Sequence, residues 1–160
     1  MALKAFHKIL RPCYGILVLF FLPITLYAQP GIRPSLSLEY LIPVRESENF
    51  GIGTMLNFEW LPEERIWGLR FTTGAAFSIT TDEYKEAVGY VPLSLAIRLK
   101  MLPRFYLGAE TGGAFGFNGY KNHLITGIGA AYRFAEHWAF EFSFRNVGYR
   151  YLVPRLTYLF

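Results

Sequence analysis

The chain has 160 residues, of which 52% are hydrophobic, 18% are aromatic and only 18% are charged. This length corresponds to about one ordinary domain, and the high apolar content excludes an intrinsically disordered chain. The 16 basic and 12 acidic residues give a net charge of +4, a small excess whose meaning depends on where the basic residues lie.

Residues 1–28 have the pattern of a secretory signal peptide. A basic start is followed by an apolar run over residues 15–26, and Ala28 ends a small-residue cleavage pattern. A membrane helix needs about 20 apolar residues, whereas this run is shorter and contains Pro23. We therefore expect a signal peptide that is cleaved after Ala28, and a mature domain over residues 29–160.

Removal of this leader changes the charge and the cysteine content. The leader carries three of the 16 basic residues, none of the 12 acidic residues and Cys13, which is the sole cysteine, so the net charge falls to +1. The remaining basic residues are scattered, which gives no footprint for nucleic acid. The histidines show no metal-ligand spacing and the glycines form no dinucleotide loop. We expect no cofactor, no metal and no nucleic-acid partner.

The mature sequence alternates between large apolar residues and small or charged ones with a period of two. Over residues 138–145 every even position is aromatic, and residues 50–60 and 91–100 alternate in the same way. No apolar stretch is long enough for a membrane helix, but charge-free windows of ten or eleven residues recur. A transmembrane strand needs about 9 to 11 residues, so the pattern favours membrane-spanning strands.

Turn-forming residues divide the pattern into eight segments joined by short connections. We therefore predict an all-β fold, an eight-stranded antiparallel up-and-down transmembrane β-barrel. Pro92 and Pro154 fall within strands, where we expect a bulge or a strand end because proline has no N–H for the ladder. The expected strands are at about 33–42, 49–60, 66–80, 88–100, 105–117, 123–134, 138–146 and 151–160.

The size of such a barrel predicts which face of each strand points inward. The interior of an eight-stranded barrel is only just wide enough for side chains, so the face rich in glycine and alanine lines the lumen and the large apolar residues face lipid. Buried charges persist when they are paired, so we predict a lumen ion-pair network that plugs the barrel; a charged channel lining is the alternative. Its members are Glu39, Glu59, Arg70, Arg98, Glu110, Arg133, Glu141, Arg145 and Arg155.

Tryptophan marks one expected edge of the membrane. Trp60, Trp67 and Trp138 flank two of the short connections, as in the aromatic girdle of a membrane barrel. With an even number of strands both chain ends lie at this edge, which we expect to be periplasmic.

The last ten residues also alternate, and they end on Phe160. Together with the leader, the alternating strands and the short turns, they make the mature chain resemble the small eight-stranded outer-membrane barrels of Gram-negative bacteria, such as the membrane domain of outer-membrane protein A. This resemblance implies an outer-membrane location, contact with outer-membrane lipid and lipopolysaccharide, and a monomer. It also implies assembly by periplasmic chaperones and the barrel-assembly machinery, with Leu156, Tyr158 and Phe160 as the assembly signal.

Some members of this superfamily are lipid A deacylases with a late His-x-Ser-Asn pattern. If Asn146 matches the asparagine, Ser143 stands in place of the base histidine and Arg145 in place of the nucleophile. Neither residue can serve in that position, so we expect no enzyme but a structural or accessory envelope protein. Three alternatives stay open: a narrow solute channel, a lipid A-modifying acyl hydrolase that uses His123, and a soluble lipocalin-like carrier with an apolar interior.

Overall fold

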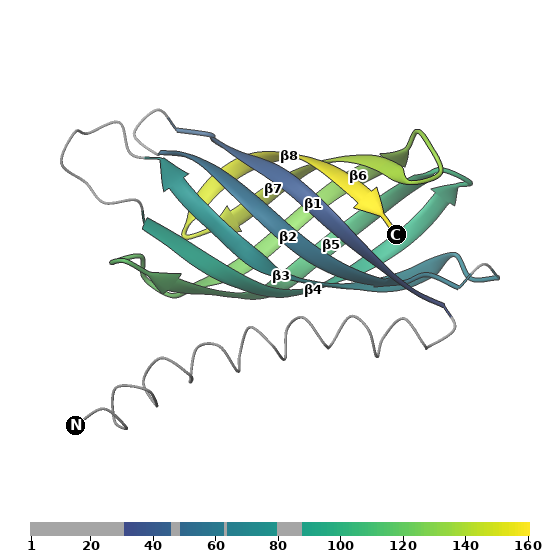
Figure 1. The fold of residues 1–160 in the computed structure, drawn as a ribbon, viewed down its shortest axis with the longest axis horizontal. Coiled ribbons are helices and arrows are strands. Elements are labelled where there is room, and N and C mark those ends of the chain that lie inside the picture. The colour runs from purple at the N-terminus through teal and green to yellow at the C-terminus, as the bar shows by residue number, and fades with distance from the viewer. Residues whose placement is uncertain (1–30, 46–48, 63, 80–87) are drawn as a thin grey trace, which may run out of the picture. The chain divides into compact units, whose positions relative to one another are not determined.

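The computed structural model describes residues 31–45, 49–62, 64–79 and 88–160, and these residues form a closed barrel of eight strands in chain order (Figure 1). The predicted all-β, eight-stranded antiparallel barrel is confirmed, while the proposed signal peptide lies outside the described residues. Among the described residues, no helix is long and apolar enough to cross a membrane. The strands are β1 Ile32–Pro43, β2 Phe50–Trp60, β3 Trp67–Ile79, β4 Val88–Leu102, β5 Phe105–Phe117, β6 His123–Arg133, β7 Trp138–Val147 and β8 Tyr149–Leu159.

The two ends of the barrel differ in their connections. We call the end where β1 begins and β8 ends the chain-end rim, and the opposite end the loop rim. The β7–β8 connection at the loop rim is the single residue Gly148, with φ of 71°, so it is tighter than the expected turn over 147–150. Glycine fits there because this left-handed conformation is costly for other residues. At the chain-end rim β4 runs on to Leu102 through a register shift that follows Lys100.

The two prolines within strands are accommodated differently from our expectation. The β3–β4 ladder lacks the pairs of Gly74 with Pro92 and of Ala75 with Val91, and it resumes in the same register at Ala76 and Tyr90. On its other side Pro92 stays paired with Ala114 of β5. The missing proline N–H thus interrupts one ladder for two pairs, with neither a bulge nor a strand end.

Pro154 repeats this arrangement at the junction that closes the barrel. It pairs with Phe142 of β7, while the β8–β1 ladder has a gap between the Glu39–Arg155 and Ile42–Leu152 pairs without a change of register. Proline is therefore compatible with a barrel strand because only one of its two neighbours loses a hydrogen bond.

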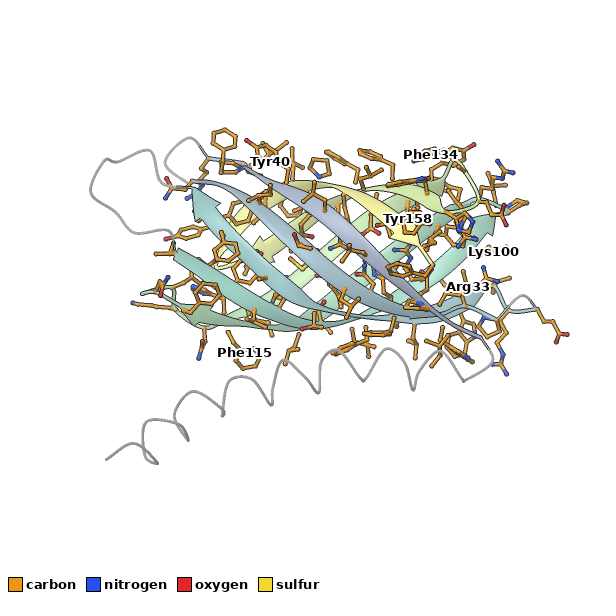
Figure 2. The ribbon with its side chains drawn as sticks, in the orientation of Figure 1. Arg33, Tyr40, Lys100, Phe115, Phe134 and Tyr158 are labelled. Atoms are coloured by element: carbon orange, nitrogen blue, oxygen red, sulfur yellow. The ribbon has the colours of Figure 1, made fainter. Side chains whose placement is uncertain are left out.

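Alternation along each strand separates an apolar exterior from an interior whose middle is polar and charged. In β1, Leu36 and Leu38 are 45% and 53% exposed, whereas Ser37 and Glu39 are each 1% exposed. Figure 2 shows the side chains around the wall, with Lys100 and Phe134 at one end of the barrel and Tyr40 toward the other. This orientation is the reverse of the apolar interior that a lipocalin-like carrier would need.

Candidate functional site

The most distinctive group of side chains in the barrel is a set of charges at the middle of the lumen. Strand register positions it along two cross-strand rows. One row runs from Glu39 on β1 through Arg155 on β8 to Glu141 on β7. The other contains Glu59, Arg70, Glu110 and Arg145 from β2, β3, β5 and β7, with Ala96 and Gly127 at the intervening positions. Acid and base alternate in both rows, so opposite charges lie next to one another inside the barrel.

Six of these side chains close into a ring of alternating carboxylates and guanidinium groups. Glu39 Oε1 accepts a hydrogen bond from Arg145 at 2.7 Å, and Glu39 Oε2 accepts one from Arg155 Nη2 at 2.8 Å. Arg145 Nε lies 3.1 Å from Glu110, and Arg70 Nη2 lies 3.8 Å from the same carboxylate.

Glu141 completes the ring. Its Oε1 accepts a hydrogen bond from Arg70 Nη2 at 3.0 Å and lies 3.6 Å from Arg155 Nη1. We call these six residues the charge ring. They are Glu39, Arg145, Glu110, Arg70, Glu141 and Arg155.

A branch extends this ring toward the chain-end rim. Arg98 donates a hydrogen bond to Glu141 Oε2 at 2.7 Å, and its Nε lies 3.4 Å from Glu59. Arg133 lies outside the network: its guanidinium is 5.8 Å from the ring centroid of Tyr106, and it makes no ion pair with any residue in the described part of the chain. The structure therefore brings together eight of the nine predicted lumen charges, four acids and four arginines, whose formal charges cancel.

The network is buried and closely surrounded. Arg155 is 0% exposed, Glu39 1% and Arg145 2%, so each charge depends on its partners rather than on water. Two small cavities adjoin it, with volumes of about 10 and 20 Å³. A single water needs roughly 10 to 15 Å³ of such volume, so each cavity has the size of about one water molecule.

Small residues on the facing strands leave the room that the charged side chains occupy. A Cβ placed on Gly108 would lie 3.3 Å from Arg98 Cδ, and one on Gly53 would lie 3.0 Å from Glu39 Cγ. Larger residues at these two positions would press against the network. The glycine-rich inner face and the charges therefore form one packing unit.

A chain of neutral polar side chains lies beside the charges, and it was not singled out from the sequence. Asn57 donates a hydrogen bond to Ser37 at 2.7 Å and accepts one from Thr72 at 2.9 Å. Ser37 and Thr157 are hydrogen-bonded at 2.8 Å, which links β1 to β8. The sequence feature that could have identified these residues is their inward position in the alternating pattern.

The loop-rim half of the lumen is apolar. Met55, Ile125, Val147 and Val153 are completely buried there. Tyr120 from the β5–β6 connection covers this layer, and its hydroxyl donates a hydrogen bond to the Val147 carbonyl at 2.8 Å. Burial raises the pKa of Tyr120 above the ordinary tyrosine value, which keeps the phenol in its neutral, donating form.

The predicted aromatic girdle lies at the chain-end rim together with Tyr158 and Phe160, while Leu156 lies further along β8, opposite Leu38. The ring centroids of Trp60 and Trp67 are 5.5 Å apart, and those of Trp138 and Tyr158 are 5.1 Å apart. Tyr158 also contacts Phe160 at 5.5 Å. Leu156, Tyr158 and Phe160 all point outward, with 41%, 37% and 54% of their surface exposed.

The residues considered for lipid A hydrolysis do not form a catalytic group. Arg145 belongs to the charge ring, and Ser143 directs its hydroxyl to the Val153 carbonyl at 3.5 Å inside the lumen. His123 packs edge-on against Tyr120 with centroids 5.3 Å apart, at the loop rim. In the described part of the chain, no three metal-ligating side chains come together.

Comparisons with known proteins agree with this architecture. No family model matches the chain, and no curated protein matches it in sequence. A de novo designed transmembrane β-barrel has a TM-score of 0.63 and 11% identity, and the match covers 82% of this chain and 98% of the designed one. This similarity extends over nearly the whole described barrel.

Two structures of the outer membrane protein Ail of Yersinia pestis are also similar. The structure in a phospholipid bilayer nanodisc has a TM-score of 0.56 and 14% identity, covering 80% of this chain and 99% of Ail. The crystal structure of this attachment invasion locus protein has a TM-score of 0.57 and 11% identity, covering 81% and 97%. The chain thus shares the fold of the small eight-stranded outer-membrane barrels, and the expected resemblance is confirmed at the level of the fold.

Proposed function

We propose that this chain is an integral outer-membrane protein with a structural or accessory role in the envelope, and that its charge network plugs the lumen. The observation that carries the proposal is the division between the two faces of every strand. Eight of the nine predicted lumen charges are paired inside, while the wall outside carries large apolar side chains such as Leu38, Leu95 and Phe142, each more than 45% exposed. In water such a belt would far exceed the apolar patches of soluble proteins, whereas lipid accepts it.

The plugged lumen is supported by the contacts across it. The charge ring joins β1, β3, β5, β7 and β8 through buried ion pairs, and the apolar layer above it is completely buried at Met55 and Ile125. An ion crossing the barrel would have to break several of these pairs in a medium of low dielectric constant, which is costly.

A structural role also fits the loop-rim connections that the structure describes. The β7–β8 connection is Gly148 alone, and the β5–β6 connection spans residues 118–122. Neither offers much of the roughly 800 Å² per partner of a standard protein interface. The fold alone does not imply catalysis, and the surroundings of Ser143 and His123 offer no nucleophile with an adjacent base.

Three measurements test this proposal. The full chain, expressed in a Gram-negative host, should fractionate with the outer membrane and migrate differently in gels before and after boiling. The purified barrel should give no steady conductance in planar bilayers. A stable conductance that changes with Arg98→Ala would overturn the plugged lumen in favour of a solute channel, and deacylated lipid A that is lost with His123→Ala would establish a hydrolase.

We further propose that Leu156, Tyr158 and Phe160 form the assembly signal read by the barrel-assembly machinery. Leu156 and Tyr158 lie on the outer face of β8, Phe160 follows its last residue, and Tyr158 is joined to Trp138 and Phe160 at the chain-end rim. Phe160→Ser should lower the amount of folded barrel in the outer membrane and raise periplasmic degradation. Leu38→Ser, a polar substitution on the outer face of β1, is the matched control, and equal losses for both variants would contradict a specific role of β8.

A further inference from the structure

An apolar groove with a volume of about 620 Å³ lies on the outer wall of the barrel over β5 and β6. Its floor is low at Ala109, a small outward residue of β5 that stands beside Leu107 and Ile128. We call this feature the wall groove, and the large side chains on its two sides are Ile97 and Leu99 of β4 and Phe142 and Phe144 of β7. Every residue that lines it is apolar, and its volume falls in the range of about 300 to 1,000 Å³ that is typical of ligand sites. The lining suits a hydrocarbon chain.

The wall groove has the depth of one leaflet of a bilayer. On β5 it extends from Leu107 to Ala109, between the chain-end rim and Thr111 at the centre of the strand. Toward the loop rim it is followed by Thr111 and its register partner Thr126, which are exposed hydroxyl-bearing residues. The hydrocarbon core of a membrane is about 30 Å thick, so an acyl chain that enters from the chain-end rim ends near the middle of the barrel. The groove therefore fits a lipid tail from one leaflet better than a protein that spans both.

Aromatic and basic residues stand where the wall groove meets the chain-end rim. Tyr132 is 50% exposed and is paired in register with Phe105 and Phe140, and aromatic residues of this kind mark the level of lipid headgroups. The β4–β5 turn places Arg104 three residues before Leu107, about 10 Å along the strand. Arg104 is exposed and makes no ion pair with any residue in the described ranges. A free cation thus lies at the open end of the groove.

The other charges at this end of the groove are mostly positive. Lys100, near the end of β4, also has no ion-pair partner among the described residues, and Figure 2 shows it at one end of the barrel. Arg133 ends β6, and its N–H donates a hydrogen bond to the Arg104 carbonyl at 2.8 Å, which holds the turn against β6. Glu136 is the sole acid in the two connections that border the groove here. This excess of positive charge complements an anionic headgroup.

We propose that the wall groove binds one acyl chain of an anionic glycerophospholipid and that Arg104 binds its phosphate. The inference rests on the proposed membrane location, in which the chain-end rim is periplasmic and borders the phospholipid leaflet. A guanidinium group suits a phosphate because its N–H groups can donate two parallel hydrogen bonds. Such a lipid explains two features together, an apolar groove of one-leaflet depth and a cation at its open end.

Native mass spectrometry of the full-length, detergent-purified barrel tests the contact with the tail, because it counts the lipids bound to each protein. The probe is dipalmitoyl phosphatidylglycerol, and we expect the wild type to bind one molecule saturably. Ala109→Phe fills the groove and should abolish this binding. Ala75→Phe, on the outer face of β3, is the matched control and should bind the lipid as the wild type does.

The same titration tests the contact with the headgroup. Arg104→Gln should weaken the binding of phosphatidylglycerol roughly fivefold, which is the effect of one basic residue near an anionic lipid surface. Arg150→Gln removes an exposed arginine at the opposite rim and should leave the affinity unchanged. Dipalmitoyl phosphatidylcholine has the same tails but no net charge, so the wild type should bind it about as weakly as Arg104→Gln binds phosphatidylglycerol.

The outcomes separate this site from the proposed function. Heat-modifiable migration identifies any variant that fails to fold, and fractionation tests the outer-membrane location independently. A folded, outer-membrane barrel whose lipid binding is unchanged by Ala109→Phe and by Arg104→Gln overturns the site and leaves the proposed function intact. Sensitivity to Ala109→Phe alone overturns the role of Arg104. Tighter binding of lipid A than of phosphatidylglycerol, lost with Ala109→Phe, overturns a phospholipid as the occupant. A barrel absent from the outer membrane overturns the proposed function itself.

Discussion

The lumen and the outer wall of this barrel are built from the same strands, yet they treat charge in opposite ways. Glu39 and Leu38 are neighbours in β1, but Glu39 contacts two arginines inside while Leu38 is 53% exposed outside. Charge is accepted in the lumen because partners from β7 and β8 surround it. In the proposed membrane location the medium around the wall is hydrocarbon, which offers no partner. The same charged side chain would therefore cost far more free energy at position 38, on the wall, than at position 39, in the lumen.

The largest expected effect comes from unbalancing the charge network. Glu141→Leu removes the carboxylate shared by Arg70, Arg98 and Arg155 and leaves four arginines with three acids. Removing one partner of a buried pair costs about 3 to 5 kcal/mol, so the free energy of unfolding in lipid vesicles should fall by this amount in urea titrations. Glu136→Leu, at an exposed position of the β6–β7 connection, is the control. Similar small losses for both would mean that the network contributes little.

The reverse substitution tests the outer wall. Leu38→Arg places a charge on the lipid face near the middle of β1 and should cost roughly 2 to 4 kcal/mol, an effect that falls to about 0 to 1 near the membrane edge. Val44→Arg, which follows β1 at the loop rim and is 51% exposed, should therefore be almost neutral in the same unfolding assay. Equal costs at both positions would contradict a membrane-embedded wall.

The alternation that predicts the wall also predicts the strands and the inward charges, because side-chain direction in a strand has a period of two. It does not predict which charges meet, since that depends on the register and shear of the closed barrel. Glu39 and Arg155 are far apart in sequence but form a direct pair because β8 closes onto β1. Arg133 has the same alternation as the other charges, yet it lies against Tyr106. The position of Arg133 along the barrel axis, relative to the other charges, could not be predicted from the sequence of β6 alone.

The prolines within strands also separate what the local sequence predicts from what depends on the neighbouring strands. The absence of an N–H at Pro92 is a local fact, and it correctly predicts a disturbed ladder. The structural outcome depends on both neighbouring strands. Pro92 keeps its pair with Ala114 of β5, while the ladder to Gly74 of β3 opens without a change of register. A bulge or a strand end was expected because the sequence does not show which neighbouring strand faces the position without an N–H.

A smaller effect should follow from crowding the lumen. A Cβ on Gly129 would lie 2.6 Å from Ser143 Cβ and 2.9 Å from the Phe142 carbonyl oxygen, so Gly129→Ala should lower the free energy of unfolding by roughly 1 to 3 kcal/mol through overpacking. On the wall, a Cβ on Gly113 would meet only the Phe115 ring, at 3.3 Å. That ring can move, and Gly113→Ala should be neutral or slightly stabilising because alanine is less flexible in the unfolded chain. Equal losses would show that the lumen is no tighter than the wall.

The smallest effect concerns the residue that covers the apolar layer of the lumen. Tyr120→Phe removes the hydrogen bond to Val147 and should cost about 0.5 to 1.5 kcal/mol. Because burial raises the pKa of Tyr120 above 10.0, the folded barrel holds this proton more tightly than the unfolded chain does. Its contribution is therefore complete below pH 10 and is lost progressively as the pH rises beyond that value.

The phenylalanine variant lacks this titration, although Tyr90, Tyr149, Tyr151 and His123 still face the site. Wild type should accordingly lose stability more steeply than Tyr120→Phe between neutral pH and about pH 11, and the difference between the two should shrink. Unfolding free energies measured over this pH range provide the test. A constant difference between the two proteins would mean that Tyr120 ionises as freely in the folded barrel as in the unfolded chain, and that the loop rim admits water to the phenol despite the packing around it.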